Sequence, residues 1–395
     1  MILTITLTLL TVSFVIFAGY TFFTIRYRNG IKDAKLKEIP RQAMPMVSIL
    51  TPLRKLDDEL EINLESCFRL DYPSFEILYA VDSMDDPIVD ILVSLKARYP
   101  HVPCKILETG HCTTENPKVN KLVSMAGIAA GAMYWVIDSN VRVEKNTLKK
   151  LVHEYVYKDS KIIFSPVRAS GSRSIGSIIE NSYFNFFLSG SVISAWKMFK
   201  QQIVIGKSIL IEKNTLKLFG GFSYFKDYLA EDYMMGETYI QSKIPISSNF
   251  TWVTTISQTS TIKSFFSRME RWAKLRFHLK FHFYLGELLL HPIMLALVFG
   301  SVIGGKKGIA VFGSAVGLKI LLEFLNFLAL NKEDRKKIRV ILLMPFCILT
   351  KDILLFIAYF SPFFSSTVNW RDGKIRIGKD TLIALSNETL LLDGA

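Results

Sequence analysis

Long apolar stretches constrain this chain more than any other feature of its sequence. The first covers residues 2–25, and a bilayer-spanning helix needs ~20 such residues. Three later stretches, 283–303, 309–330 and 340–364, are also apolar enough for a membrane. Half of the 395 residues are hydrophobic, which is too many for an ordinary soluble enzyme, and the chain is too long for one compact core. We therefore expect a membrane part joined to a globular part.

The charges that flank the first apolar stretch predict its orientation. Only Met1 precedes the stretch, and basic residues follow it at Arg26, Arg28, Lys32, Lys35, Lys37 and Arg41. A cleavable signal peptide would carry its basic residues first and have a shorter apolar core. Because positive charges stay on the cytosolic side, we expect a signal anchor with its N-terminus outside and the next domain in the cytosol. Three full crossings after that domain would place the tail outside, so one late stretch can be a re-entrant or interfacial helix, and the sequence does not show which.

The basic surplus of the chain points to an anionic partner. Lysine and arginine number 48 against 35 acidic residues, which gives a net charge of +13. Such a surplus suits nucleic acid or anionic lipid. The sequence contains no zinc-knuckle spacing, aromatic-basic RNA signature or helix-turn-helix. With several apolar stretches present, we expect a lipid surface and no nucleic acid as partner.

Between about residues 45 and 249 the sequence alternates short buried strands with helical segments. The predicted strands are 46–50, 75–81, 104–107 and 134–137. The predicted helices are 59–69, 87–99, 121–132 and 234–241. Strands separated by helices indicate a parallel α/β sheet with right-handed crossovers, and such sheets bind ligands beyond the carboxyl ends of their strands.

Two aspartates stand at those strand ends. Asp82 follows the second predicted strand, and Asp138 opens the segment Asp138-Ser-Asn140 after the fourth. One carboxylate there is enough for Mg²⁺ or Mn²⁺ when a diphosphate supplies further ligands, although Asp and Asn also build ordinary turns. Lys118 and Lys121 lie in a segment at the start of a helix, where a phosphate or a solvated turn fits equally well.

A second acidic site follows further along the chain. Glu231 and Asp232 precede a helical run, where an acidic pair is common as a helix cap. The functional alternative is a general base that takes the proton of an attacking hydroxyl. The later residues Arg268, Arg271 and Trp272 share one face of a predicted helix. Two guanidinium groups there suit a diphosphate, and a basic helix at a membrane surface is the alternative.

In this order, the motifs resemble those of a known family. They are similar to the aspartate triad and the (Gln/Arg)-x-x-Arg-Trp signature of membrane glycosyltransferases with the glycosyltransferase-A fold, a group that includes cellulose, chitin and hyaluronan synthases. The closer resemblance is to ceramide glucosyltransferases. It rests on Asn116-Pro-Lys118, Ile137-Asp-Ser139, Gly206-Lys-Ser208, Gly220-Gly221, Ala230-Glu-Asp-Tyr233, residues 267–276 and Val368-Asn-Trp-Arg371. It covers roughly residues 46–276 and that tail motif.

The resemblance implies an α/β glycosyltransferase-A fold, with a Rossmann-like mixed sheet, joined to transmembrane and interfacial helices. We expect a signal anchor at 1–27, a cytosolic catalytic domain at 43–262, an amphipathic interface helix at 263–282, membrane helices at 283–364 and a tail at 365–395.

The resemblance also implies a role for each motif. Asp82 would contact the uridine of a UDP-sugar, and Asp138 would bind the divalent cation. Asp232 would be the catalytic base, with Glu231 beside it as the second catalytic residue. The donor-binding residues would be Lys118, Lys121, Arg268, Arg271 and Trp272, the last three closing over the diphosphate and the acceptor. Asn140 departs from a strict D-x-D motif, so the choice of metal stays open.

The implied activity is an inverting transfer of a sugar, most closely glucose, to the hydroxyl of a membrane lipid such as ceramide. The lipid would enter at membrane level near 183–199, which also reads as an ordinary core helix, and near 272–283. The membrane would be a bacterial inner membrane, or a Golgi or endoplasmic reticulum membrane. The sequence does not indicate the oligomeric state.

Three alternatives remain from the sequence. The acceptor can be another lipid of the diacylglycerol, phospholipid or hopanoid type. A processive polysaccharide synthase would normally carry Gln at the first signature position. An inactive membrane scaffold or transporter-like protein belongs to another class, and Glu323 and Asp352 in the last two apolar stretches are too few acidic groups for a transport path.

Overall fold

The computed structural model describes residues 1–33, 37–111, 115–248, 251–370 and 373–384. Arg371 and residues 385–395 of the predicted tail therefore lie outside the described residues.

The chain divides into two compact units, and each unit is built from separate segments of the sequence. The first unit contains residues 1–29, 168–199 and 257–395. The second contains residues 30–167 and 200–256. Of the predicted catalytic domain, 43–262, residues 43–167 and 200–256 lie in the second unit, and residues 168–199 and 257–262 lie in the first.

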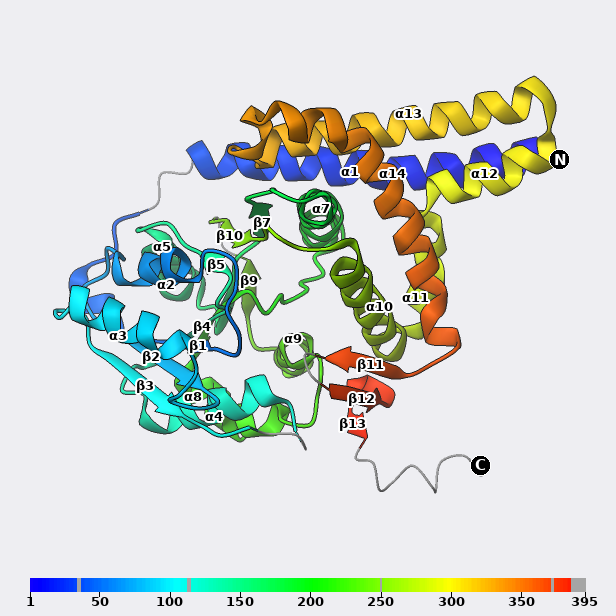
Figure 1. The fold of residues 1–395 in the computed structure, drawn as a ribbon. Coiled ribbons are helices and arrows are strands. Elements are labelled where there is room, and N and C mark those ends of the chain that lie inside the picture. Colours follow the sequence, from blue (N-terminus) through cyan, green and yellow to red (C-terminus); the bar gives the residue numbers. More distant parts are fainter. Residues whose placement is uncertain (34–36, 112–114, 249–250, 371–372, 385–395) are drawn as a thin grey trace, which may run out of the picture. The chain divides into compact units, whose positions relative to one another are not determined.

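The second unit is organised around a seven-stranded sheet in the order β3-β2-β1-β4-β8-β6-β9 (Figure 1). Its strands are β1 (Val47–Pro52), β2 (Phe75–Val81), β3 (Cys104–Glu108), β4 (Met133–Ile137), β6 (Ile162–Phe164), β8 (Ser208–Glu212) and β9 (Ile246–Ser248). The first four strands pair in parallel, as predicted. Strand β8 runs antiparallel to both β4 and β6, so the sheet is mixed. This arrangement confirms the predicted α/β fold class with a mixed sheet.

The central strands are buried along their whole length, as the burial of β1 and β4 shows. A parallel sheet covered on both faces favours continuous apolar strands, which explains why the sequence revealed them. The helices of this unit are α2 (Leu60–Phe68), α3 (Ile88–Arg98), α4 (Pro117–Ile128), α5 (Thr147–Lys158), α8 (Lys213–Leu218) and α9 (Glu231–Gln241), with short turns η1 (Arg41–Ala43) and η3 (Gly221–Phe225). A short antiparallel pair joins β5 (Val141–Arg142) to β10 (Val253–Ile256).

Helix α4 begins earlier than the sequence predicted. The prediction was 121–132, and the helix instead starts at Pro117. The side chain of Asn116 accepts hydrogen bonds from the backbone N–H groups of Lys118 and Val119, and proline is favoured at the first helical position. This start carries Lys118 and Lys121 on the first turns of a helix.

The first unit is mostly helical. Its helices are α1 (Ile2–Asp33), α6 (Ile175–Ser182), the π-helix η2 (Tyr183–Leu188), α7 (Ser189–Phe199), α10 (Ile262–Leu279), α11 (Phe281–Gly286), η4 (Glu287–Leu290), α12 (Pro292–Ile303), α13 (Gly305–Leu330), η5 (Asp334–Lys336), α14 (Ile338–Phe360) and η6 (Ser361–Phe363). Strand β7 (Val167–Ser170) begins at the last residue of the second unit's first segment and continues into the first unit. A small sheet contains β11 (Thr367–Trp370), β12 (Gly373–Ile377) and β13 (Ile383–Ala384), and the turn η7 (Lys379–Thr381) lies between the last two strands.

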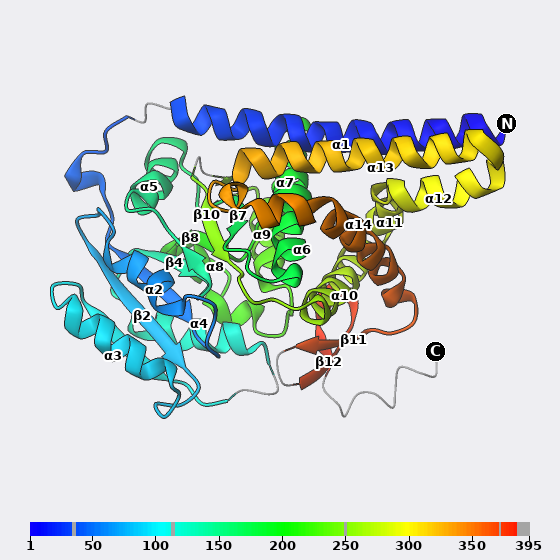
Figure 2. The same cartoon turned by 45° about the horizontal axis from the view of Figure 1, so that its top comes forward.

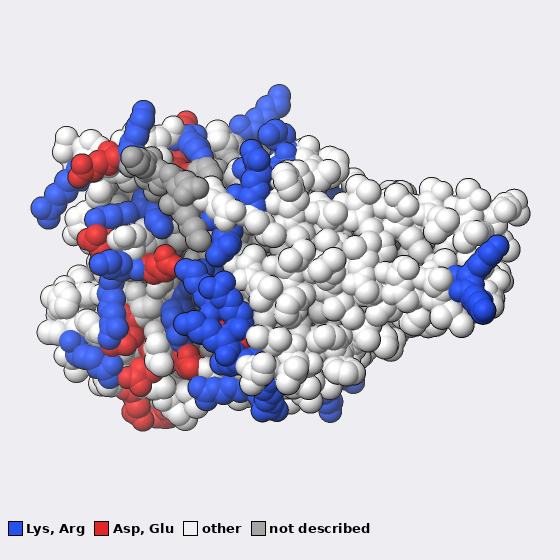
Figure 3. Space-filling model, turned by 90° about the horizontal axis from the view of Figure 1, so that it is seen from above, with Lys and Arg blue, Asp and Glu red and all other residues white. Residues whose placement is uncertain are grey.

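Among the residues that the structure describes, three helices are long and apolar enough to cross a membrane: 2–30, 305–330 and 338–363. The first of the three predicted late stretches, 283–303, is broken instead. Its two halves, 281–290 and 292–303, bend by 67° at His291. Figure 3 shows a broad surface over the long helices that has no charged side chains apart from one group of basic side chains at its far end.

Helices α1 and α13 lie side by side and run in the same direction (Figures 1 and 2). Leu10 packs in one cluster with Ala315, and eleven residues further along each helix Asn326 Nδ2 donates to Thr21 Oγ1 at 2.8 Å. Helix α12 returns against α13, and a Cβ on Gly308 would overlap the carbonyl of Gly300. The turn between α12 and α13 is therefore at the Met1 end of α1.

Helix α14 returns toward the segments that precede α6 and α10. Before the helix, Asp334 accepts hydrogen bonds from the backbone N–H and the hydroxyl of Ser172 at 3.0 and 2.8 Å. Near its end, Tyr284 Oη donates to the carbonyl of Tyr359 at 2.7 Å. Beyond the helix and the turn η6, Lys274 of α10 donates to the carbonyl of Thr367 in β11 at 2.7 Å. Hydrogen bonds thus tie both ends of α14 to elements around α6 and α10.

Four buried charges lie between α13 and α14 and neutralise one another. Lys319 Nζ is 2.7 Å from Glu323 Oε1 and 3.1 Å from Asp352 Oδ2. Lys351 Nζ is 2.5 Å from Glu323 Oε2, and Ser182 donates to the same oxygen at 2.9 Å. Buried charges persist in apolar surroundings when they are paired in this way. Glu323 and Asp352, the two acidic residues considered for a transport path, therefore each have a lysine partner.

The course of α13 predicts the sides on which its ends are exposed. At 1.5 Å per residue its 26 residues extend about 39 Å, more than the ~30 Å of a hydrocarbon core. In a variant without native cysteines, a cysteine at Lys306 and one at Lys336 should react with a membrane-impermeant maleimide from opposite faces of sealed vesicles. Labelling of both from one face would contradict a full crossing by α13.

Candidate active site

The predicted strand-end aspartates lie at one edge of the sheet. Asp82 directly follows β2, Asp138 directly follows β4, and β1 pairs in parallel with both strands. Carboxyl ends of parallel strands meet at the same edge, where open α/β sheets bind ligands. The structure thus brings Asp82 and Asp138 to the place that the sequence analysis expected.

The first turns of α4 connect the two aspartates. Lys118 Nζ is 3.2 Å from Asp138 Oδ1, and Lys121 Nζ is 2.7 Å from Asp82 Oδ1. Residues three apart are neighbours on one helix face, so a single helix can serve both strand ends. Arg54 Nε also approaches Asp82 Oδ2, at 3.5 Å. Both lysines of the predicted donor site therefore face the predicted aspartates.

The acidic pair at the start of α9 joins the same network, and its two members have different surroundings. Glu231 is 5% exposed, and its carboxylate meets Lys118 Nζ at 3.0 Å and Asn116 Nδ2 at 3.1 Å. Asp232 instead accepts backbone N–H groups from Gly206 at 2.6 Å and from Tyr233 at 2.8 Å. The two carboxylates therefore have different partners: a lysine and an amide side chain for Glu231, and backbone N–H groups for Asp232.

The pKa values of Asp232 and Asp138 shift in opposite directions, which suits different roles for the two carboxyls. Burial and the neighbouring Glu231 carboxylate raise the pKa of Asp232 to about 6. Burial alone would raise the pKa of Asp138, but the ammonium groups of Lys118 and Lys207 hold it well below its usual range. Burial would lower the pKa of Lys118, yet the carboxylates of Asp138, Glu231 and Asp232 raise it above its ordinary value. Asp138 therefore stays ionised, while Asp232 can exchange a proton near neutral pH.

Gly206 is required by the close approach of backbone to carboxylate. A Cβ at this position would lie 2.7 Å from Asp232 Oδ2 and 3.1 Å from Lys118 Nζ. The first contact is shorter than a real Cβ makes and the second is tight, so glycine allows the N–H its close approach to Asp232. This glycine lies in the motif Gly206-Lys-Ser208, but its role could not be predicted from the sequence.

Lys207 is the second residue that the sequence analysis left without a role. Its Nζ lies 3.0 Å from Asp138 Oδ2 and 2.8 Å from Asn140 Oδ1. The register of β4 against β8 pairs Ile137 with Ser208 and so brings Lys207 opposite Asp138. The antiparallel pairing of β8 was not predicted, which is why this contact could not be found from the sequence.

The contacts around Asp138 show whether its surroundings fit the predicted divalent cation. Each oxygen of that carboxylate lies within 3.2 Å of an ammonium group, and Lys207 also binds the oxygen of Asn140. Across the described parts of the chain, no three His, Cys, Asp or Glu side chains are grouped so that they could hold a metal ion. A divalent cation prefers carboxylate and carbonyl oxygens that are not already bound to cations. These residues do not fit a cation held by the protein alone.

The signature residues lie on α10 in the first unit. The helix begins with a capping box, in which Thr261 and Ser264 exchange side-chain and backbone hydrogen bonds. Arg268 forms an ion pair with the buried Glu180 of α6. The ring of Trp272 lies 5.8 Å from that of Tyr183 in the π-helix, while Arg271 is half-buried on the same helix. Glu180 was also missed, because its partner is far away in the sequence.

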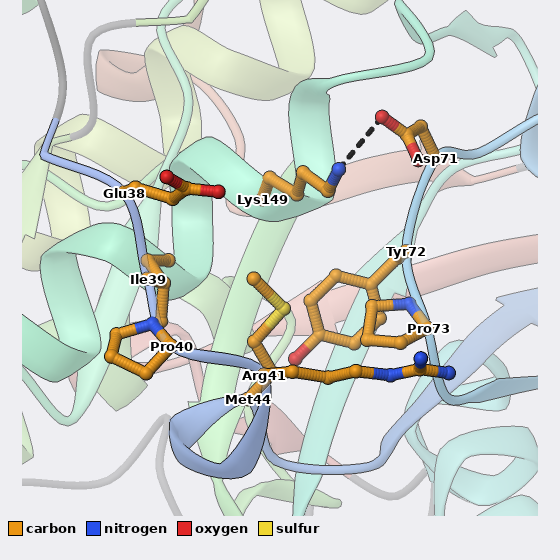
Figure 4. A pocket seen from close by; sticks show the side chains of 9 residues that line it. All are labelled: Glu38, Ile39, Pro40, Arg41, Met44, Asp71, Tyr72, Pro73 and Lys149. Atoms are coloured by element: carbon orange, nitrogen blue, oxygen red, sulfur yellow. Dashed lines mark hydrogen bonds and ion pairs between the residues drawn. The ribbon is translucent and has the colours of Figure 1, made fainter.

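A separate pocket lies on the surface of the second unit and contains none of the predicted site residues (Figure 4). It has a volume of about 490 Å³. Lys149 reaches across it to Asp71, with Nζ and Oδ2 at 2.7 Å. Its remaining lining comes mainly from the segment that follows α1, including Arg41. Its carboxylates, Glu38 and Asp71, do not follow parallel strands of the sheet, so the sheet edge is the better candidate site.

The chain is similar to a known protein family and to several named proteins. Residues 8–383 match the model of glycosyl transferase family 21. Ceramide glucosyltransferase 1 of Caenorhabditis elegans is 25% identical over 373 residues, which cover 91% of this chain and 77% of that protein. Ceramide glucosyltransferase of Komagataella phaffii is 37% identical over 141 residues, which cover 34% of this chain and 27% of that protein.

Among solved structures, the mannosyltransferase PcManGT from Pyrobaculum calidifontis, in complex with GDP-Man and Mn²⁺, matches with a TM-score of 0.49 and 14% identity. The match covers 90% of this chain and 99% of that one. It is too distant for its donor or its metal to be transferred to this chain.

Replacing Gly206 by alanine should weaken the folded protein. The added methyl group would overlap Asp232 and Lys118, and overpacking of this kind costs about 1–3 kcal/mol. The measurement is the melting temperature in detergent, which should fall. The matched control is Gly127→Ala, an exposed helical position of α4 where a Cβ would meet nothing within 4 Å. A Gly206→Ala protein as stable as the Gly127→Ala protein would show that this backbone contact is not tight.

Proposed function

Because the chain belongs to glycosyl transferase family 21, we propose that it moves one sugar from a UDP-sugar to the hydroxyl of a membrane lipid, with inversion at the anomeric carbon. One observation carries the proposal: α4 joins Asp82, Asp138 and Glu231 through two lysines, and Asp232 lies next to that network with a raised pKa. A cationic surface beside a poised base suits transfer away from an anionic leaving group.

The donor would bind across the sheet edge. Asp82 would contact the uridine, while Lys118 and Lys121 would face the diphosphate. Ammonium groups that are already oriented by carboxylates need little reorganisation when charge develops on the departing UDP. The divalent cation stays a prediction, and the residues around Asp138 do not fit one that the protein alone would hold.

Asp232 would act as the base on the opposite face of the sugar. It would take the proton of the lipid hydroxyl as that oxygen attacks the anomeric carbon and the bond to the diphosphate breaks. Glu231 would assist by keeping the pKa of Asp232 high and by holding Lys118. Arg268, Arg271 and Trp272 are proposed to close over the diphosphate and the acceptor, with Arg268 oriented by Glu180.

Ceramide is the proposed acceptor and glucose the proposed sugar. Two relatives with these matches are named ceramide glucosyltransferases, and the long apolar helices suit a substrate that stays in the bilayer. The catalytic unit would face the cytosol. Diacylglycerol, phospholipid and hopanoid acceptors remain the alternatives, as does a processive polysaccharide synthase. Arg268 in place of Gln at the first signature position favours a single transfer.

The assignment of the base predicts the behaviour of one isosteric variant. Purified protein would be incubated with ceramide and a panel of UDP-sugars, and the glycolipid product measured. Asp232→Asn should lower turnover by about 10²–10⁴-fold, the usual contribution of a general base. Asp227→Asn makes the same chemical change at an exposed position of the loop before α9 and should leave turnover unchanged. Equal turnover in both variants would make Asp232 a helix cap.

The raised pKa of Asp232 predicts the pH profile. Because its pKa is raised to about 6, the carboxyl is protonated and inactive as a base below that pH. The value of kcat/KM should rise with pH through about 6 and level off above it. In Glu231→Gln the nearby negative charge is lost, so the pKa of Asp232 falls and the acidic limb should move to lower pH. An acidic limb that stays in place would contradict the coupling of the two carboxyls.

A further inference from the structure

In the candidate site, two side chains bind Lys207, a residue to which the proposed function gives no role. Asp138 Oδ2 and Asn140 Oδ1 both hold its ammonium group, at 3.0 and 2.8 Å. The backbone adds a third link, because Asp138 donates its N–H to the carbonyl of Lys207 at 3.3 Å. A lysine ammonium has three N–H donors, and these contacts use two of them. One donor is left for a ligand.

The same contacts explain the departure from a D-x-D motif. A metal site at this strand end would gain from a second carboxylate, whereas Asn140 presents a neutral oxygen to an ammonium group. The other oxygen of Asp138 is held by Lys118. A dication at Asp138 would have to displace both lysines from a carboxylate that they already neutralise. Residues 138 and 140 therefore have the chemistry of a lysine-orienting pair.

We propose that Lys207 binds the donor diphosphate and takes the place of a protein-bound divalent cation, with Asp138 and Asn140 as positioning residues. The inference rests on the proposed function and names a residue for it. In the reaction the bond from the anomeric carbon to the diphosphate oxygen breaks, and its electron pair stays on UDP. The lipid oxygen forms the new bond, and its proton passes to Asp232. Lys207 and Lys118 stabilise the charge gained by UDP, so no further reactant is required.

The first test is binding of UDP to the full-length protein in detergent, measured by calorimetry in excess EDTA. The wild type should bind, and adding Mg²⁺ or Mn²⁺ should leave its Kd nearly unchanged. Lys207→Gln should weaken binding by roughly tenfold to a hundredfold, as expected for one lost charge-assisted hydrogen bond. Lys207→Arg keeps the charge and should retain most of the affinity. Lys217→Gln, at an exposed position of α8, is the matched control and should bind as the wild type does.

The second test is glycolipid synthesis by the same proteins. Chelation should leave wild-type turnover intact, and Lys207→Gln should lose turnover while keeping the wild-type melting temperature. Loss of UDP binding in EDTA that Mn²⁺ restores would overturn the inference and return Asp138 to the role of metal ligand. Wild-type affinity in Lys207→Gln would overturn it as well. If the wild type binds UDP in EDTA but transfers no sugar, the proposed function fails while the role of Lys207 in binding stands.

Discussion

The candidate site depends on the contacts of the half-buried Lys118 ammonium group. It lies 3.2 Å from Asp138 after β4 and 3.0 Å from Glu231 at the start of α9. Carboxylates that are wholly or partly removed from water are costly unless they are paired, so this lysine helps to bring two of them to one sheet edge. Asn116 fixes the start of α4 and also donates to Glu231 at 3.1 Å. The cap that begins the helix thus helps to hold the acidic pair.

Much of the sheet could be predicted because its central strands are short, apolar and buried on both faces. Asp82 and Asp138 were found for the same reason, since each directly follows such a strand. The direction of β8 could not be predicted, because residues 168–199 intervene and belong to the other unit. The alternation of predicted strands and helices does not indicate that residues 168–199 belong to a different unit. The parallel sheet that it predicts is therefore correct for β1 to β4 and incomplete beyond them.

Only those residues of the site that lie in recognisable sequence motifs could be predicted, and their contacts with one another could not. The sequence identifies the carboxylates and the two lysines of α4, but it does not say which cation meets which anion. Lys207 lies next to Asp138 because of strand register, and Glu180 meets Arg268 across two helices. Gly206 matters only because a carboxylate approaches its backbone. Each of these contacts joins residues that are far apart in the chain, so no local pattern announces it.

The electrostatics of the chain also bear on whether it is a catalyst or a scaffold. In the membrane helices, Glu323 and Asp352 each meet a lysine, which leaves no uncompensated charge for a transport path among these residues. At the sheet edge, in contrast, the half-buried Asp232 lies beside the buried Glu231, and its pKa rises to about 6. Holding two carboxylates together costs folding free energy, and a purely structural protein would gain nothing from it. A base that must accept a proton near neutral pH does gain, and this difference favours the transferase over an inactive scaffold.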